Sequence, residues 1–197
     1  MRRALQHLPP PIEALAIGAS AGGIDALITL FSGLEPPWRA PVIVVLHLPE
    51  DHDSQLAGMF ARRLGIHAVE AAPGAPAEPG HFYVAPPGYH LLVEAGRTFS
   101  LSCEAPVQFS RPSIDVLMES CADAYGESLA GLVLTGANED GAEGLAAIRA
   151  AGGLALAQDP DEAAQPAMPQ AAIARANPHA VLPLAELRPL LEKLLRP

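Results

Sequence analysis

Four short apolar runs alternate along the chain with segments of helical period. The runs are "EALAIG" at 13–18, "PVIVVLH" at 41–47, "LAGLVLTG" at 129–136 and "GLALAQ" at 153–158. Continuous apolar runs of this length are typical of parallel strands that are buried on both faces. Because helical segments separate them, the pattern predicts an α/β fold with a doubly wound, mainly parallel sheet in three Rossmann-like layers.

The helical segments are marked by apolar residues three and four positions apart. Such spacing occurs at 24–31 and at 114–125, where Ser113 is placed to cap the helix, and the carboxyl end "AELRPLLEKLLRP" indicates a closing helix. Residues 79–102 differ, because Pro-Gly and Ala-Gly turns join short apolar stretches there. This segment predicts an antiparallel hairpin at the edge of the sheet.

The composition indicates a single globular domain. Half of the 197 residues are apolar, 17% are charged, and the formal net charge is -10. We expect residues 13–197 to form one domain after an N-terminal extension at 1–12. The negative charge argues against nucleic acid and anionic membranes as partners, and no apolar run is long enough for membrane insertion. Two cysteines, Cys103 and Cys121, are too few for a disulfide framework, so we expect a reduced, cytoplasmic setting.

A glycine-rich turn, "IGASAGG" at 17–23, follows the first apolar run. A P-loop is excluded because no Gly-Lys-Ser/Thr follows, and a dinucleotide fingerprint is weak because Ser20 replaces its second glycine. Gly18 to Gly22 instead fit G-x-S-x-G, the pattern of a nucleophile turn. An ordinary tight turn between strand and helix also favours Gly, Ala and Ser, so both interpretations stay open from this stretch alone.

Three residues of complementary chemistry follow apolar runs. Ser20 follows the first run, His47 ends the second, and Asp140 lies in the loop after the third. Because ligands of open α/β sheets bind beyond the carboxyl ends of the strands, we expect these side chains to share one edge. A hydroxyl, an imidazole and a carboxylate are the components of a catalytic triad, and helix N-termini can supply oxyanion donors. Asp140 can also cap the following helix, and the two roles are compatible.

Other interpretations of the polar residues are weaker. Five more histidines compete with His47, but none directly ends a continuous apolar run. A metal site at His47, Asp51, His52 and Asp53 is an alternative, although the spacing fits no zinc pattern. The chain order serine, histidine, acid differs from the serine, acid, histidine order of α/β-hydrolases. A serine hydrolase with this order would therefore be of another type.

Five ordered segments together resemble one known family. They are "AIGASAGGIDAL", "VIVVLHLP", "SRPSIDVLMESCADAYG", "LTGANEDGAEGLAAIRAAGGLALAQDP" and "AMPQAAI". In this order and spacing they resemble the catalytic domain of the chemotaxis protein-glutamate methylesterase (CheB) family, from about residue 13 to the carboxyl end. The resemblance implies a doubly wound catalytic domain that uses no metal and no cofactor.

The resemblance also implies a reaction and a partner. Family members hydrolyse glutamate methyl esters on the cytoplasmic signalling helices of methyl-accepting chemoreceptors and release methanol, and some also deamidate receptor glutamines. Carried over to this sequence, Ser20 would be the nucleophile, His47 the general base and acid, and Asp140 the orienting carboxylate. Gly22 and Gly23 would clear space over Ser20 for a bulky protein substrate.

The sequence departs from the family pattern at several positions. The family commonly has threonine where this chain has Ala21. It also commonly has Thr-Gly-Met-Gly before the aspartate, where this chain has Thr135-Gly136-Ala137-Asn138. With Gly22, these residues are expected on the substrate or oxyanion side of the site. Arg111 is a candidate substrate contact, with a surface ion pair as the alternative.

Regulation and activity are expected to differ from those of many relatives. Many carry an amino-terminal receiver domain, whereas only about a dozen residues precede the first strand here. We therefore expect a stand-alone enzyme whose control comes from a separate receiver or kinase protein. The altered aspartate loop leaves an alternative function, a catalytically weak receptor-binding module of the same fold.

Overall fold

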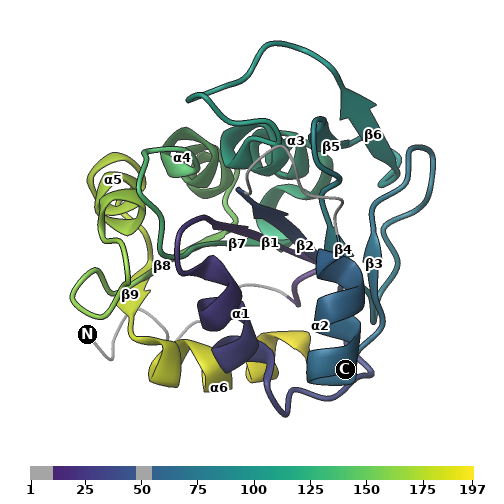
Figure 1. The fold of residues 1–197 in the computed structure, drawn as a ribbon, viewed down its shortest axis with the longest axis horizontal. Helices are drawn as coiled ribbons and strands as arrows, with labels where there is room; N and C mark the ends of the chain where they lie inside the picture. Colours follow the sequence, from purple (N-terminus) through teal and green to yellow (C-terminus); the bar gives the residue numbers. More distant parts are fainter. Residues whose placement is uncertain (1–10, 48–54) are drawn as a thin grey trace.

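The computed structural model describes residues 11–47 and 55–197 and contains two β-sheets (Figure 1). The main sheet has seven strands, all parallel, in the order β3-β4-β2-β1-β7-β8-β9, and β5 and β6 form a separate antiparallel pair. The strands are β1 (Ala14–Ala19), β2 (Val42–Leu46), β3 (Ala68–Glu70), β4 (Phe82–Val84), β5 (His90–Val93), β6 (Phe99–Ser102), β7 (Leu129–Val133), β8 (Leu154–Gln158) and β9 (Ala180–Leu182).

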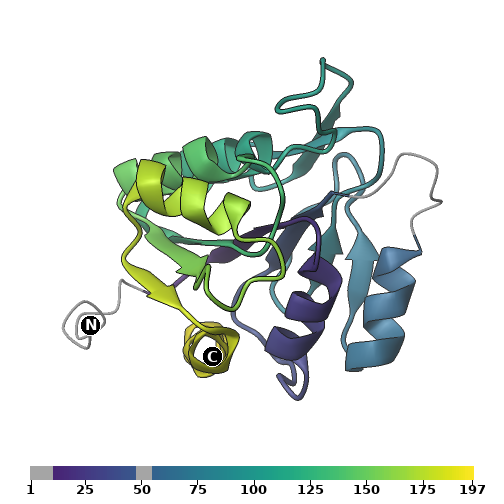
Figure 2. The same ribbon diagram turned by 60° about the vertical axis from the view of Figure 1, so that its left-hand side comes forward.

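Helices cover both faces of the main sheet (Figure 2). One face carries α1 (Gly23–Phe31), α2 (Leu56–Leu64) and α6 (Leu184–Leu195). The other carries α3 (Ile114–Tyr125), α4 (Ala142–Ala150) and α5 (Ala167–Ala176), with a 3-10 turn at Gly126–Ser128. Each face has its own buried apolar cluster, so the predicted three-layer, doubly wound fold is confirmed.

The four apolar runs of the sequence form the centre of the sheet. They are β2, β1, β7 and β8, and every residue in these strands is buried. The predicted helices at 24–31 and 114–125 are also present as α1 and α3, and Ser113 is the N-cap of α3. Burial on both faces explains why these strands are uniformly apolar rather than alternating.

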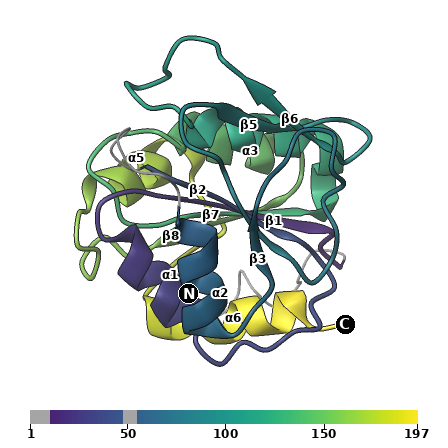
Figure 3. The ribbon, with the colours of Figure 1, turned by 45° about the vertical axis from the view of Figure 1, so that its right-hand side comes forward.

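The middle of the chain differs from the prediction in one respect. The antiparallel hairpin exists, but β5 and β6 form a sheet of their own beside α3 instead of extending the edge of the main sheet (Figure 3). The first part of the same segment, β4, joins the main sheet in parallel between β2 and β3. The turn chemistry at 79–102 therefore identified the hairpin but not where it lies.

The strand order has a topological switch point between β1 and β7. The chain leaves β1 into α1 on one face and leaves β7 into α4 on the opposite face, although β1 and β7 are neighbours. Loops that diverge to opposite faces open a crevice where ligands of such sheets bind. Ser20 follows β1 and Asp140 lies between β7 and α4, so both lie at this switch point.

None of the helices in the described ranges is both long and apolar enough to cross a membrane.

Candidate active site

Strand pairing places Ser20 and His47 side by side. Ala19 of β1 is in direct register with Leu46 of β2, and the next residue on each strand is Ser20 or His47. The backbone N–H of His47 donates to the carbonyl of Ala19 at 3.1 Å, which continues the ladder to the strand ends. Since neighbouring strands lie about 4.8 Å apart, the hydroxyl and the imidazole begin from adjacent backbone positions.

Thr135 holds the turn that carries Ser20. Its carbonyl accepts a hydrogen bond from the Ser20 N–H at 2.9 Å, and its Oγ1 donates to the carbonyl of Ala21 at 2.8 Å. The same Oγ1 accepts from the N–H of Gln165 at 2.8 Å. Thr135 is buried, with 1% exposure, and sequence reasoning missed it as a positioning residue. The signal was a polar residue at the end of an otherwise apolar strand run.

The glycines of this turn are required by its packing. Gly22 has a φ of 80°, and a Cβ there would lie 2.6 Å from the Cβ of Ala164. A Cβ on Gly23 would lie 2.6 Å from Leu46 Cδ1 and 2.7 Å from Ala19 Cβ. Both positions therefore need glycine so that the turn can pack against the protein itself. The expectation that they clear space for substrate stays a prediction.

Asp140 is a fully buried carboxylate held by four donors. Oδ2 accepts from His47 Nε2 at 2.8 Å and from the N–H of Ile114 at 2.7 Å. Oδ1 accepts from the Ser113 hydroxyl and from the N–H of Asp115, both at 2.9 Å. The donors other than His47 belong to the N-terminus of α3, where free N–H groups and the helix dipole favour an anion.

These donors keep Asp140 ionised. Burial alone would raise its pKa, but the hydrogen bonds from His47 and from the N–H groups of Asp115 and Ile114 outweigh burial and lower the pKa. An ionised Asp140 can only accept hydrogen bonds, so the proton between it and His47 resides on Nε2. Nδ1 is then the ring nitrogen with a lone pair for accepting a proton.

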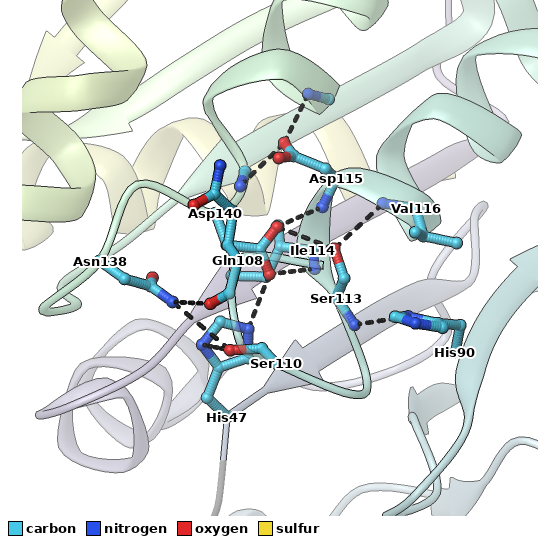
Figure 4. A network of polar contacts seen from close by, with 12 residues as sticks. His47, His90, Gln108, Ser110, Ser113, Ile114, Asp115, Val116, Asn138 and Asp140 are labelled. Atoms are coloured by element: carbon cyan, nitrogen blue, oxygen red, sulfur yellow. Dashed lines mark hydrogen bonds and ion pairs between the residues drawn. The ribbon is translucent and has the colours of Figure 1, made fainter. Parts of the chain in front are cut away.

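Asp115, in the first turn of α3, accepts hydrogen bonds from the start of α4, whereas Asp140, just before α4, accepts them from the start of α3 (Figure 4). Its Oδ1 accepts from the N–H of Gly141 at 2.9 Å and of Gly144 at 2.7 Å, at the start of α4. Burial, followed by the nearby charge of Asp140, raises the pKa of Asp115 to about 6, against those hydrogen bonds. Sequence reasoning missed Asp115, whose only signal was a carboxylate in the first turn of a helix.

The second nitrogen of His47 faces a residue that the sequence did not single out. The Ser110 hydroxyl lies 3.4 Å from His47 Nδ1, and the side chain of His47 is 11% exposed. Asn138 Nδ2 lies 3.4 Å from the Ser110 oxygen and 3.5 Å from the carbonyl of Gln108 (Figure 4). The altered aspartate loop thus contacts the segment that covers the imidazole.

The remaining sequence candidates line the same edge. The N–H groups of Ala21, Gly22, Ala137 and Asn138 donate no hydrogen bond to any described residue. Arg111 Nη1 donates to the carbonyls of Cys103 and Glu104 at 3.2 and 3.1 Å. Within the described ranges Arg111 forms no ion pair, so it braces this loop instead of forming the surface pair considered as an alternative.

A buried histidine also supports the loop before α3. His90 Nδ1 accepts from the N–H of Ser113 at 3.2 Å, and Nε2 lies 3.1 Å from the carbonyl of Ala105. One nitrogen must accept and the other donate, so this imidazole is neutral with its proton on Nε2. His90 is 1% exposed and fixes the segment between β6 and α3, a structural role for one of the competing histidines.

The metal alternative concerns residues that are mostly not described. Asp51, His52 and Asp53 lie outside the described residues. Across 11–47 and 55–197, no group of three or more His, Cys, Asp or Glu residues is placed to hold a metal ion.

The fold and this set of groups define a class of protein. A serine turn, an imidazole and a buried carboxylate at the carboxyl edge of a doubly wound sheet are the groups from which serine hydrolases build their sites. The sequence matches the family model described as CheB methylesterase over residues 15–191. The chain belongs to the CheB methylesterase family of carboxylic ester hydrolases.

Relatives and a solved structure agree with this assignment. A Leptospira interrogans protein (strain Fiocruz L1-130), provisionally named protein-glutamate methylesterase/protein-glutamine glutaminase, is 42% identical over 182 residues, covering 92% of this chain and 94% of the relative. An Anaeromyxobacter dehalogenans protein named protein-glutamate methylesterase/protein-glutamine glutaminase 2 is 40% identical over 185 residues, covering 94% of this chain and 54% of the relative. The crystal structure of the Thermotoga maritima CheB methylesterase catalytic domain superposes with a TM-score of 0.88 at 28% identity, covering 93% of this chain and 99% of that one.

Proposed function

We propose that this protein hydrolyses glutamate methyl esters on the cytoplasmic helices of chemoreceptors and also deamidates glutamines there. The names of its relatives support the two reactions. The observation that carries the proposal is the 2.8 Å contact of His47 with a buried, ionised Asp140, one strand away from the Ser20 turn. Such a pair supplies the base that a serine hydroxyl needs at neutral pH.

The reaction proceeds through an acyl-enzyme. Ser20 Oγ attacks the ester carbonyl carbon while His47 Nδ1 takes the hydroxyl proton, and Asp140 stabilises the resulting imidazolium. The carbon–oxygen bond to the methoxy group breaks, and that oxygen leaves as methanol with the proton from His47. Water then attacks the acyl carbon while His47 Nδ1 takes one of its protons. The bond from that carbon to Ser20 Oγ breaks, His47 returns the proton to Oγ, and the glutamate side chain is released as the free acid, which ionises in water.

The backbone N–H groups that donate to no described residue are the candidate oxyanion donors. Those of Ala21 and Gly22 lie in the nucleophile turn before α1, and those of Ala137 and Asn138 lie across the crevice after β7. A preorganised donor of this kind contributes about 3–4 kcal/mol to stabilisation of the transition state. Backbone donors would tolerate the replacement of the family's usual residues at these positions.

Removal of the nucleophile or the base tests the proposal. We expect Ser20→Ala and His47→Ala to lower methanol release from methyl-labelled receptor membranes by at least about a thousandfold, because triad members act as a unit. Glu139→Gln, an exposed neighbour of Asp140, is the control and should retain activity. Near wild-type release by either alanine variant would exclude the assignment.

A catalytically weak receptor-binding module is the second candidate. It is favoured by one observation, the Ser110 hydroxyl facing the nitrogen of His47 that Ser20 would need. A serine-reactive fluorophosphonate separates the two functions. Labelling that maps to Ser20 supports the enzyme, whereas an unlabelled protein that still binds receptor membranes supports the module.

A further inference from the structure

The turn at Val107–Ser110 adopts a costly backbone conformation. Val107 and Ser110 exchange two backbone hydrogen bonds, of 3.1 and 2.8 Å, around the two residues Gln108 and Phe109. Both central residues have positive φ, 48° and 62°. Such two-residue turns strongly prefer Asn-Gly, and a left-handed conformation costs other residues about 1–2 kcal/mol each. A strained turn of unsuitable residues beside an active site points to a functional role.

In this turn, one side chain is exposed to solvent and the next contacts the imidazole of His47. Phe109 is fully exposed, at 102%, whereas the next residue, Ser110, places its hydroxyl 3.4 Å from His47 Nδ1. Asn138 lies under the turn and contacts both the Gln108 carbonyl and the Ser110 hydroxyl. Phe109 is one of two exposed large apolar side chains in the described ranges, and it directly precedes the residue that contacts His47, so it is placed where a substrate bound at the site could pack on it.

The Ser110 hydroxyl competes with the proposed nucleophile. Because Asp140 fixes the proton of His47 on Nε2, Nδ1 has a single lone pair. That lone pair cannot accept well from both Ser110 and Ser20. The Ser110 contact is at the long limit of a hydrogen bond, so a small movement of the turn would release Nδ1.

We propose that the turn at Val107–Ser110 couples docking of the protein substrate to release of the catalytic base. Phe109 is the apolar anchor that packs on the substrate helix, and its docking withdraws Ser110 from His47 Nδ1. The inference rests on the proposed function, because it takes a receptor helix as the partner. It makes the turn a determinant of selectivity for a protein over a small ester.

Comparison of a protein substrate with a small reagent tests the anchor. We expect Phe109→Ala to lower kcat/KM for methanol release from labelled receptor at least tenfold more than it lowers the rate of fluorophosphonate labelling. Tyr89→Ala, which truncates the other exposed large apolar side chain in the described ranges, is the matched control. Equal losses on both substrates, or equal losses in the Phe109 and Tyr89 variants, would overturn the anchor.

A second variant tests the contact with His47. We expect Ser110→Ala to raise the rate of fluorophosphonate labelling of Ser20 about two- to fivefold, and Ser110→Thr, which keeps the hydroxyl, to restore the wild-type rate. An unchanged or lower rate in Ser110→Ala would overturn the competition for Nδ1. If the wild type is labelled but releases no methanol from receptor, the proposed substrate fails and Phe109 loses its partner, while the result for Ser110 still stands.

Discussion

Asp140 and Asp115 share one network of hydrogen bonds, yet their pKa values move in opposite directions. Both are buried, and both accept backbone N–H groups from a helix N-terminus. Asp140 also accepts from His47, and its pKa is lowered, whereas burial and the charge of Asp140 raise the pKa of Asp115 to about 6. The hydrogen bond from His47 therefore explains why Asp140 has the lower pKa of the two carboxyl groups.

The raised pKa of Asp115 makes folding stability depend on pH. A carboxyl group with a pKa of about 6 when folded and about 3.9 when unfolded stabilises the fold fully below about pH 4, and that contribution is lost as pH rises through 6. An asparagine amide in its place would not titrate and could still accept from Gly141 and Gly144. As pH rises from 4 to 7.5, the wild type should therefore lose stability that Asp115→Asn does not lose. We expect the difference in free energy of unfolding, variant minus wild type, to increase over this range by on the order of 1–3 kcal/mol. Urea unfolding across this range measures it, and a difference that is constant with pH would contradict it.

At the scale of elements, α3 is the part that organises the site. It approaches β1 closely because Gly18 has no side chain, and a Cβ there would lie 2.2 Å from Ile114 Cγ2. This approach presents the first N–H groups of α3 to Asp140. Ser113 serves both partners, since its Oγ accepts from the N–H of Val116 at 3.4 Å and donates to Asp140.

Removal of the Ser113 hydroxyl should affect stability and activity together. Loss of an N-cap costs about 1 kcal/mol, and loss of a hydrogen bond to a charged group adds about 1.5–3 kcal/mol. We expect Ser113→Ala to lower the free energy of unfolding by about 2.5–4 kcal/mol and to slow fluorophosphonate labelling about tenfold. Ser32→Ala removes an exposed hydroxyl at the end of α1 and is the control for both measurements. Wild-type labelling by Ser113→Ala would show that Asp140 does not depend on this donor.

The parts of the site that follow strand order could be predicted from the sequence, and the parts that depend on helix approach could not. Ser20, His47 and Asp140 were placed at one edge because parallel strands end together. Asp115, Thr135 and Ser110 contribute through contacts between distant segments, which no local pattern encodes. The short strands β3 and β9, of three residues each, are likewise too brief to give a periodic signal.

On the scale of the whole molecule, the hydrogen-bond network at the N-termini of α3 and α4 and one of the two apolar clusters lie on different faces of the sheet. The N-terminus of α3 supplies three of the four donors to Asp140, and α3 and α4 pack on one face of the sheet, whereas α6 packs on the opposite face (Figure 1). Leu187 of α6 is fully buried in that distant cluster. The sheet therefore separates the residues that shape the site from a large share of the apolar core.

This separation predicts a variant that loses stability without losing its active site. We expect Leu187→Ala to lower the free energy of unfolding by about 2–5 kcal/mol, because it leaves a cavity in a packed core. Fluorophosphonate labelling of the folded protein should stay within twofold of wild type. Leu190→Ala, a half-buried neighbour on the same helix, should cost less stability. A tenfold loss of labelling in Leu187→Ala would contradict the separation.

The reciprocal hydrogen bonds between the N-termini of α3 and α4 have a consequence for the rates of amide hydrogen exchange. The amide protons of Ile114 and Asp115 are bound to Asp140, and those of Gly141 and Gly144 are bound to Asp115. Neither helix can open at its N-terminus without breaking contacts of the other. These four amides, which ordinarily exchange fast at helix starts, should be protected and should exchange with one shared opening free energy. The active site would then open and close as a single cooperative unit.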